Sequence, residues 1–174
     1  MKRLLPVATL IAVFFPAVCL ASGYVLVNYG IGGKVDEPSL GVELGGIFLS
    51  DLHPTGGALS LGLGVSIADT DENPPSTGEP FNTRTKFNDG NEQEIDVTFG
   101  AEMIPSFFAV AGVGYASQDT VTIGSDAGQA VEVGSDTDRN ATWMLGARYV
   151  IEGLNLGLGF HSRRGVMASV GIAF

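Results

Sequence analysis

The chain has 174 residues, a length that suits a single domain, and its formal net charge at pH 7 is −10. So acidic a chain is a poor candidate for binding nucleic acid or an anionic membrane surface, because both would repel it. The one cysteine, Cys19, falls in a segment that we expect to be removed. Disulfides, a cysteine nucleophile and a cysteine-built metal site are then excluded from the mature protein.

Residues 1–21 are predicted to form a secretory signal peptide. Lys2 and Arg3 give a basic start, an apolar run extends from Leu4 to Leu20, and Ala21 provides a small residue for cleavage. A retained membrane helix is the alternative, although the run is barely long enough to span a bilayer and contains two prolines. Cleavage near Ala21 leaves a mature domain of residues 22–174, with 7 basic and 19 acidic residues and a net charge of −12.

After the signal peptide the sequence shows no long helical period, but eight segments alternate apolar residues with small or polar ones. This period of two is typical of β-strands that have one apolar face. Each segment is about ten residues long, which is the length that a tilted strand needs to cross a bilayer. In chain order the predicted strands are Tyr24–Gly33, Leu40–Leu49, Ala58–Ala68, Gln93–Ile104, Phe107–Ser117, Thr142–Ile151, Leu154–Arg163 and Gly165–Phe174.

The predicted connections between these strands alternate in length. Three are short and turn-like: Ser50–Gly57, Pro105-Ser106 and Glu152-Gly153. Two are long, polar and expected to be flexible: Asp69–Glu92 and Gln118–Ala141. Short turns on one side and longer loops on the other indicate a transmembrane barrel with both ends in the periplasm. The remaining outer connections, Lys34–Ser39 and Arg163–Gly165, are short exceptions.

Glycines recur at alternate positions on the second face of several predicted strands, as in the pairs Gly62 and Gly64, and Gly112 and Gly114. A row of glycines suits the crowded interior of a narrow barrel. A soluble barrel with an inward apolar face is the alternative, but its exposed face would carry charged residues and threonine. Aromatic residues near the strand ends are expected to form two girdles at the membrane interfaces: Tyr24, Phe48, Phe107, Trp143, Tyr149 and Phe174.

The last ten residues alternate strictly, and Val170, Ile172 and Phe174 share the apolar face. This ending resembles the sorting signal of bacterial outer-membrane β-barrels, in which a terminal Phe follows apolar residues at alternate positions. The resemblance implies that the barrel-insertion machinery recognises these three residues.

On strand number, loop asymmetry, the middle strand that ends at Tyr115 and the Phe174 ending, the chain resembles the small eight-stranded outer-membrane proteins, of the OmpX, OmpA transmembrane-domain and opacity-protein types. The resemblance covers essentially the whole mature chain. It implies an all-β fold, an eight-stranded antiparallel up-and-down transmembrane β-barrel in the outer membrane of a Gram-negative cell.

Proteins of these types include adhesins, structural anchors, small pores and lipid-A-modifying enzymes. We expect a monomer without enzymatic activity, cofactor or metal. Its partners would be outer-membrane lipids, lipopolysaccharide, the barrel-insertion machinery and an extracellular ligand. Its expected role is structural or interactive at the cell surface. The alternatives are a narrow porin-like channel for ions or small solutes and a lipid-A-modifying hydrolase.

Several ionisable residues fall on the small, lumen-facing side of the predicted strands: Glu43, Glu94, Asp96, Glu102, Arg148, His161 and Arg163. Buried charges in a narrow barrel must pair. We therefore hypothesise a charge network of Glu43, Glu102, Arg148 and His161, in which Arg148 bridges the two glutamates and plugs the lumen. A gated pore lined by the same charges is the alternative.

Two further groups could carry chemistry. Lipid-A deacylases of this barrel class place a His and a Ser on one strand face, but here His161 and Ser162 are adjacent and point to opposite faces, which disfavours a nucleophile and base pair. Paired aspartates in the outer loops could contact divalent cations shared with lipopolysaccharide, although solvated loop tips are the simpler interpretation. These aspartates are Asp69, Asp71, Asp136 and Asp138.

Overall fold

The computed structural model describes residues 22–35, 37–49 and 57–174. The predicted signal peptide, and all of the predicted turn Ser50–Gly57 except Gly57, lie outside the described residues. Within those ranges no helix is long and apolar enough to cross a lipid bilayer.

The described residues form nine β-strands, all of whose pairings are antiparallel. The strands are β1 (Ser22–Ile31), β2 (Ser39–Leu49), β3 (Ala58–Asp69), β4 (Thr85–Asn88), β5 (Asn91–Ile104), β6 (Phe107–Asp126), β7 (Gln129–Ile151), β8 (Leu154–His161) and β9 (Gly165–Ala173).

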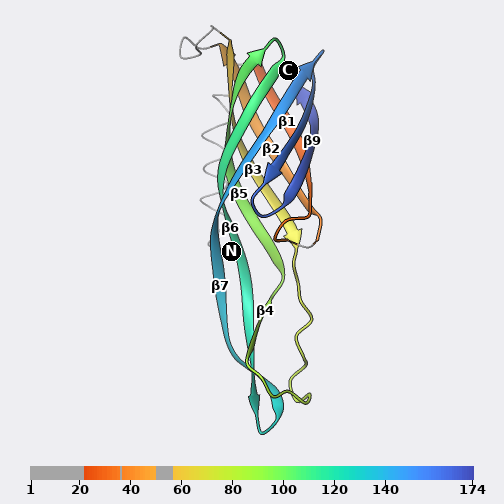
Figure 1. The fold of residues 1–174 in the computed structure, drawn as a ribbon, viewed down its shortest axis with the longest axis vertical. Helices are drawn as coiled ribbons and strands as arrows, with labels where there is room; N and C mark the ends of the chain where they lie inside the picture. Colours follow the sequence, from red (N-terminus) through yellow and green to blue (C-terminus); the bar gives the residue numbers. More distant parts are fainter. Residues whose placement is uncertain (1–21, 36, 50–56) are drawn as a thin grey trace.

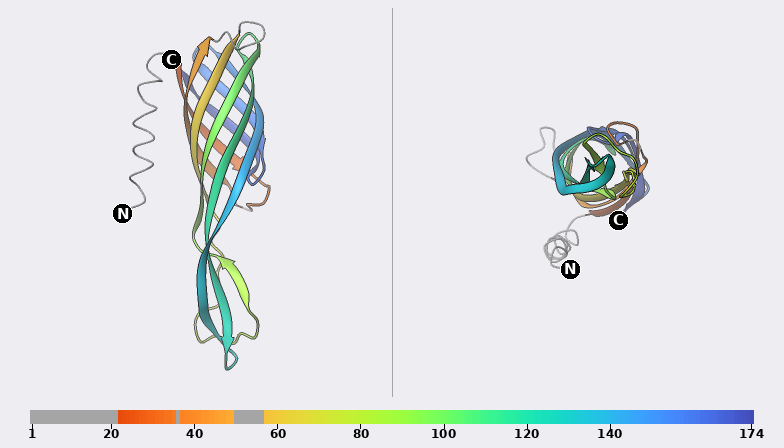
Figure 2. Two further views of the ribbon diagram at one scale, coloured as in Figure 1. Left: turned by 90° about the vertical axis from the view of Figure 1, so that its left-hand side faces the viewer. Right: turned by 90° about the horizontal axis from the view of Figure 1, so that it is seen from below.

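Eight of these strands close into an up-and-down barrel, because β1 pairs with β9 at one seam and β6 pairs with β7 as well as with β5. The ring order is β1, β2, β3, β5, β6, β7, β8 and β9. Figure 2 shows the closed ring from one end and the tilt of the strands from the side. The predicted fold class, a closed eight-stranded antiparallel barrel, is therefore confirmed.

The strands β6 and β7 continue far beyond the barrel as one hairpin, and β4 pairs with the outer part of β6 (Figure 1). We call this projection the tongue; it comprises β4, residues 118–126 of β6 and residues 129–141 of β7. The prediction of a flexible loop over residues 118–141 is therefore wrong. Its residues are alternating strand formers such as Val121 and Ile123. The hairpin turns at Ala127 and Gly128, whose φ angles of 49° and 83° fit a type I′ turn.

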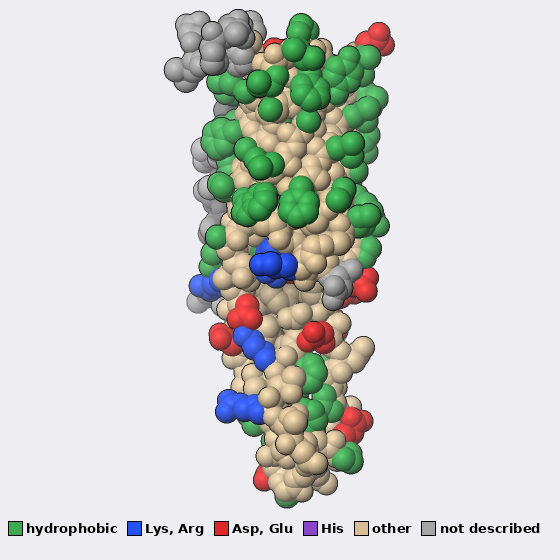
Figure 3. Space-filling model, in the orientation of Figure 1, with side chains coloured by type: hydrophobic (Ala, Val, Ile, Leu, Met, Phe, Trp, Pro, Cys, Tyr) green, Lys and Arg blue, Asp and Glu red, His purple; other side chains and the backbone are tan. Residues whose placement is uncertain are grey.

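The barrel carries its apolar side chains on the outside. Figure 3 shows them gathered over the barrel wall, with Lys and Arg side chains lying toward the tongue. The outward residues include Val27, Leu158 and Val170, which are 48%, 69% and 52% exposed. By contrast, the buried apolar cluster inside the barrel is small, built on Ala58, Phe108 and Val110. An apolar exterior around a polar interior is the reverse of a soluble barrel.

Of the predicted aromatic girdle, Phe48, Trp143, Tyr149 and Phe174 are exposed on the outer surface and Phe107 is half-buried. Tyr24 does not belong to the girdle, and this prediction was wrong. Its side chain is only 1% exposed and points into the lumen. The reason is strand parity, since the outward residues of β1 are the odd-numbered Val27, Tyr29 and Ile31.

Candidate functional site in the barrel interior

A layer of charged and polar side chains crosses the barrel on the side away from the tongue. Arg148 Nη2 donates to Glu43 Oε2 at 2.5 Å, and Arg148 Nη1 donates to the Tyr24 hydroxyl at 3.0 Å. Glu43 Oε1 accepts hydrogen bonds from the Tyr24 and Thr98 hydroxyls at 2.7 and 2.5 Å. The guanidinium carbon also lies 5.2 Å from the centre of the Tyr24 ring, a cation–π distance. We call these four residues the inner brace.

The inner brace joins opposite walls of the barrel. Glu43 lies on β2 and Arg148 on β7, and these strands are four places apart in the ring of eight. Glycines in neighbouring strands leave the space that these side chains occupy. A Cβ at Gly62 would lie 2.2 Å from Glu43 Oε1, and one at Gly45 would lie 2.3 Å from the Tyr24 ring. The alternating glycines are thus a requirement of the charged interior.

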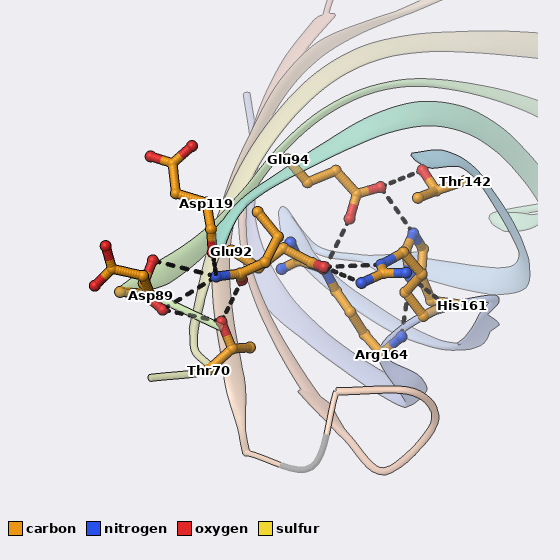
Figure 4. A network of polar contacts seen from close by, with 11 residues as sticks. Thr70, Asp89, Glu92, Glu94, Asp119, Thr142, His161 and Arg164 are labelled. Atoms are coloured by element: carbon orange, nitrogen blue, oxygen red, sulfur yellow. Dashed lines mark hydrogen bonds and ion pairs between the residues drawn. The ribbon is translucent and has the colours of Figure 1, made fainter. Parts of the chain in front are cut away.

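A second charged layer lies closer to the tongue (Figure 4). Glu94 on β5 accepts hydrogen bonds at one oxygen from His161, at 3.0 Å, and from the Thr142 hydroxyl. Its other oxygen accepts from Arg164 Nε at 2.8 Å. Glu92 on β5 forms an ion pair with Arg163. We call Glu92, Glu94, Thr142, His161, Arg163 and Arg164 the outer brace.

The outer brace also spans the barrel, because its arginines belong to the β8–β9 turn and β5 lies four places from β9 in the ring. The ring of His161 organises that turn. Its Nδ1 accepts the backbone N–H groups of Arg163 and Arg164 at 3.3 and 3.2 Å. With Nδ1 accepting, the network assigns the ring proton to Nε2, which donates to Glu94.

Glu102, the remaining member of the predicted network, lies near the β5–β6 turn. Its carboxylate accepts the backbone N–H groups of Ala58 at 2.9 Å and Ser106 at 2.7 Å. The structure thus brings Arg148 together with Glu43 and places His161 in the separate outer brace. A bridge from Arg148 to Glu102 stays a prediction.

Five residues of the two braces escaped the sequence reasoning, among them Thr98 and Thr142, to which it gave no role. Tyr24 was assigned to the lipid-facing side, Glu92 to a loop, and Arg164 to a short turn without a role. Their burial at 1%, 0% and 2% exposure marks them as interior groups. The parity of β1 and β5 could have identified Tyr24 and Glu92, because both share a face with lumen residues of the same strand. Nothing in the sequence marks Arg164, which follows β8 in a turn.

His161 and Ser162 have separate surroundings. His161 is buried in the outer brace, whereas the Ser162 hydroxyl accepts the backbone N–H of Trp143 at 3.1 Å. Within the described ranges no hydrogen bond joins the two side chains. This arrangement does not supply the paired nucleophile and base that ester hydrolysis would need.

The loop aspartates engage in local contacts. Asp69 accepts from the Asp71 backbone at 3.2 Å, and Asp71 accepts from the Gly90 backbone at 3.1 Å. Asp136 accepts from the backbone of Thr137, and Asp138 forms an exposed ion pair with Lys86 at 2.7 Å. In the part of the chain that the structure describes, no three His, Cys, Asp or Glu side chains group into a metal site.

Gln118 fastens the tongue to the barrel rim. Its amide nitrogen donates to the carbonyl of Asp119 at 2.7 Å and that of Asp89 at 3.3 Å, and its amide oxygen accepts the hydroxyl of Thr70. Figure 4 shows Thr70, Asp89 and Asp119 gathered at this point. Gln118 is only 3% exposed, so these bonds fix the segment 70–90 against β6.

The three residues of the predicted insertion signal lie on the outer surface at the barrel seam. Val170, Ile172 and Phe174 are 52%, 59% and 68% exposed, and β9 pairs along its length with β1. Phe174 exchanges backbone hydrogen bonds with Gly23 at 2.7 and 2.8 Å. Recognition by the insertion machinery stays a prediction.

No protein-family model and no curated protein sequence matches this chain. Among solved structures, the chain is similar to Ail, the attachment invasion locus protein of Yersinia pestis, in a crystal structure of its complex with the heparin analogue sucrose octasulfate. The two chains are 12% identical with a TM-score of 0.38, and the match covers 87% of this chain and 94% of that chain.

Proposed function

We propose that this protein is a monomeric outer-membrane β-barrel that holds its lumen shut and presents the tongue to the cell exterior, without enzymatic activity. The observation that carries the proposal is the inverted barrel, with exposed Leu158 and Val170 outside and buried Glu43, Glu94 and Arg148 inside. In water this surface would be a large exposed apolar patch, whereas contact with lipid makes the outward placement of these side chains favourable.

Blockage of the lumen follows from the two braces. Each joins opposite walls, and together they lie at two levels of the barrel. An eight-stranded barrel has an interior just wide enough for side chains to fill. Buried charges that are paired and hydrogen-bonded across this interior leave no open water path and hold the wall in one shape.

The tongue is the element available for contact with a partner. It projects from the barrel end opposite Phe174 (Figure 1), so periplasmic chain ends would place it outside the cell. Its surface carries exposed carboxylates, among them Asp126, Glu132 and Asp136. We therefore propose that its extracellular ligand carries positive charge, because anionic surfaces would be repelled.

Single-channel conductance of the refolded protein in a planar bilayer tests the closed lumen. Wild type should be silent, and the double variant Arg148→Ala with Arg164→Ala should conduct because it removes a cation from each brace. Arg139→Ala is the matched control, since Arg139 is an exposed arginine of β7 in the tongue. A conducting wild type would overturn the closed barrel and favour a narrow channel, for which the two interior cavities along the lumen would be the path.

Orientation in the membrane is tested by labelling single cysteines on intact cells with a membrane-impermeant maleimide. Val133→Cys in the tongue should react, whereas Ile104→Cys at the other barrel end should react only after the outer membrane is permeabilised. The two sites are 49% and 64% exposed, so both are open to the reagent. Labelling of Ile104→Cys alone on intact cells would reverse the orientation.

A further inference from the structure

A chamber inside the barrel borders the outer brace and contains two kinds of unsatisfied polar group. Arg164 is 2% exposed, and its Nε is bound to Glu94, but Nη1 and Nη2 have no hydrogen-bond partner among the described residues. These nitrogens belong to a guanidinium that lines the chamber. A buried cation with idle donors is costly, so something is expected to accept from them.

Asp96 on β5 lines the same chamber and supplies the complementary group. Within the described ranges its carboxylate forms no hydrogen bond and no ion pair. Glu94, two residues away on the same face, already uses both oxygens in the outer brace. The chamber therefore has unsatisfied donors on Arg164 and unsatisfied acceptors on Asp96, and among the described residues no ion pair joins the two side chains.

The chemistry of these walls selects the ligand. An anion such as chloride would satisfy Arg164 but would face the carboxylates of Asp96 and Glu94. A metal cation would satisfy Asp96 but would face the guanidinium. A water molecule accepts from one group and donates to the other, so it satisfies both at once.

We propose that this chamber is a water-binding site, in which ordered water bridges the Arg164 guanidinium to the Asp96 carboxylate. The remaining polar walls, Asn28, Ser39 and Ser66, offer the further partners that a buried water needs. Room for water is small, on the order of one to a few molecules. The other buried side-chain atoms that lack a partner among the described residues, Glu92 Oε1 and Asn155 Oδ1, belong to residues that do not line this chamber.

A second cavity continues the lumen toward the inner brace and is lined by Arg148 and Ser169. It shares Asn28, Met144 and Met167 with the chamber, so these three side chains stand between the two spaces. The proposed water is therefore confined between the outer brace and two methionines. We expect this confinement to slow its exchange with bulk solvent enough to measure.

High-resolution crystal structures of the full mature protein, from crystals grown once in chloride and once in bromide, test the proposal directly. We expect water density within hydrogen-bond distance of Arg164 Nη and Asp96 Oδ, with no anomalous bromide signal there. A dry chamber, a bromide at Arg164, or a direct ion pair between Arg164 and Asp96 would each overturn it.

Water-oxygen magnetic relaxation dispersion of the refolded protein gives a second, solution measurement. Asp96→Leu should remove about one long-lived water from the wild-type count, because it fills the chamber and deletes the acceptor. Asp96→Asn should keep that water, since its amide still hydrogen-bonds. The control Arg139→Met, an exposed arginine outside the barrel, should leave the count unchanged. A wild-type count that Asp96→Leu does not lower would contradict the proposal.

Discussion

At the scale of single residues, the interior depends on arginines that face buried carboxylates across the lumen. Arg148 and Glu43 are 6% and 1% exposed, so neither charge can be satisfied by bulk water. Such a pair contributes little net stability by itself compared with apolar packing, but removal of one partner leaves the other uncompensated. The energetic importance of these residues is therefore seen in single variants rather than in the intact pair.

We predict that Arg148→Met lowers the free energy of unfolding by about 3–5 kcal/mol, because Glu43 becomes a buried unpaired charge. Urea unfolding in lipid vesicles, followed by the fluorescence of the single tryptophan, Trp143, measures the change. The control Lys86→Met removes the exposed ion pair with Asp138 and should cost less than about 1 kcal/mol. The double variant of Arg148→Met with Glu43→Gln should recover part of the lost stability. Equal costs for Arg148→Met and Lys86→Met would contradict the inner brace.

Glycine at the barrel seam is a second requirement at the residue scale. A Cβ at Gly171 would lie 1.8 Å from the carbonyl oxygen of Val25 on the neighbouring β1, whereas a Cβ at Gly134 in the tongue meets nothing within 4 Å. Gly171→Ala should therefore destabilise the barrel by about 1–3 kcal/mol through overpacking. Gly134→Ala is the matched control and should be close to neutral. Similar melting temperatures for the two variants would show that the seam is more tolerant than its backbone spacing indicates.

At the scale of elements, the tongue shows why a polar segment can still be sheet. Its alternating Val, Ile and Thr residues are interrupted by aspartates, so composition indicated a loop. Pairing from Phe107–Tyr149 out to Asp126–Gln129, with one register shift between Thr122 and Ile123, makes it a hairpin. The pairing begins in the barrel, where register is set by the buried face, and continues outward from there. The composition of the tongue alone does not show that its pairing continues from the barrel strands.

We predict that Gln118→Ala loosens the segment 70–90 without unfolding the barrel. The substitution removes the side-chain donor to Asp89 and the acceptor for Thr70, worth about 1–2 kcal/mol together. Limited proteolysis of that segment should accelerate by roughly 5–30-fold, because cleavage follows the population of the open form. Gln129→Ala, an exposed residue at the tongue tip, should leave the cleavage rate unchanged. Equal rates for both variants would remove Gln118 from this role.

At the scale of the whole molecule, the placement of apolar side chains should decide which medium surrounds the barrel. Leu158 is 69% exposed near the middle of the outer wall, and Val133 is 49% exposed on the tongue. In a membrane, Leu158→Arg should cost about 2–4 kcal/mol, whereas Val133→Arg should stay within about 0.5 kcal/mol of wild type. Refolding yield and urea titration in vesicles compare the two. A tolerated Leu158→Arg would argue against a lipid-facing wall.

The sequence by itself determined the eight barrel strands and most of their outward faces, because a period of two is a local property that persists through each of these strands; it missed the tongue and the inward side of Tyr24. It also identified Glu43, Arg148 and His161 as lumen residues through their parity. Only the tertiary structure decided which charges meet. Arg148 on β7 reaches Glu43 on β2, four places away in the ring, and His161 on β8 and Arg164 in the β8–β9 turn reach Glu94 on β5. Such contacts depend on the register of every intervening pair, which no local pattern contains.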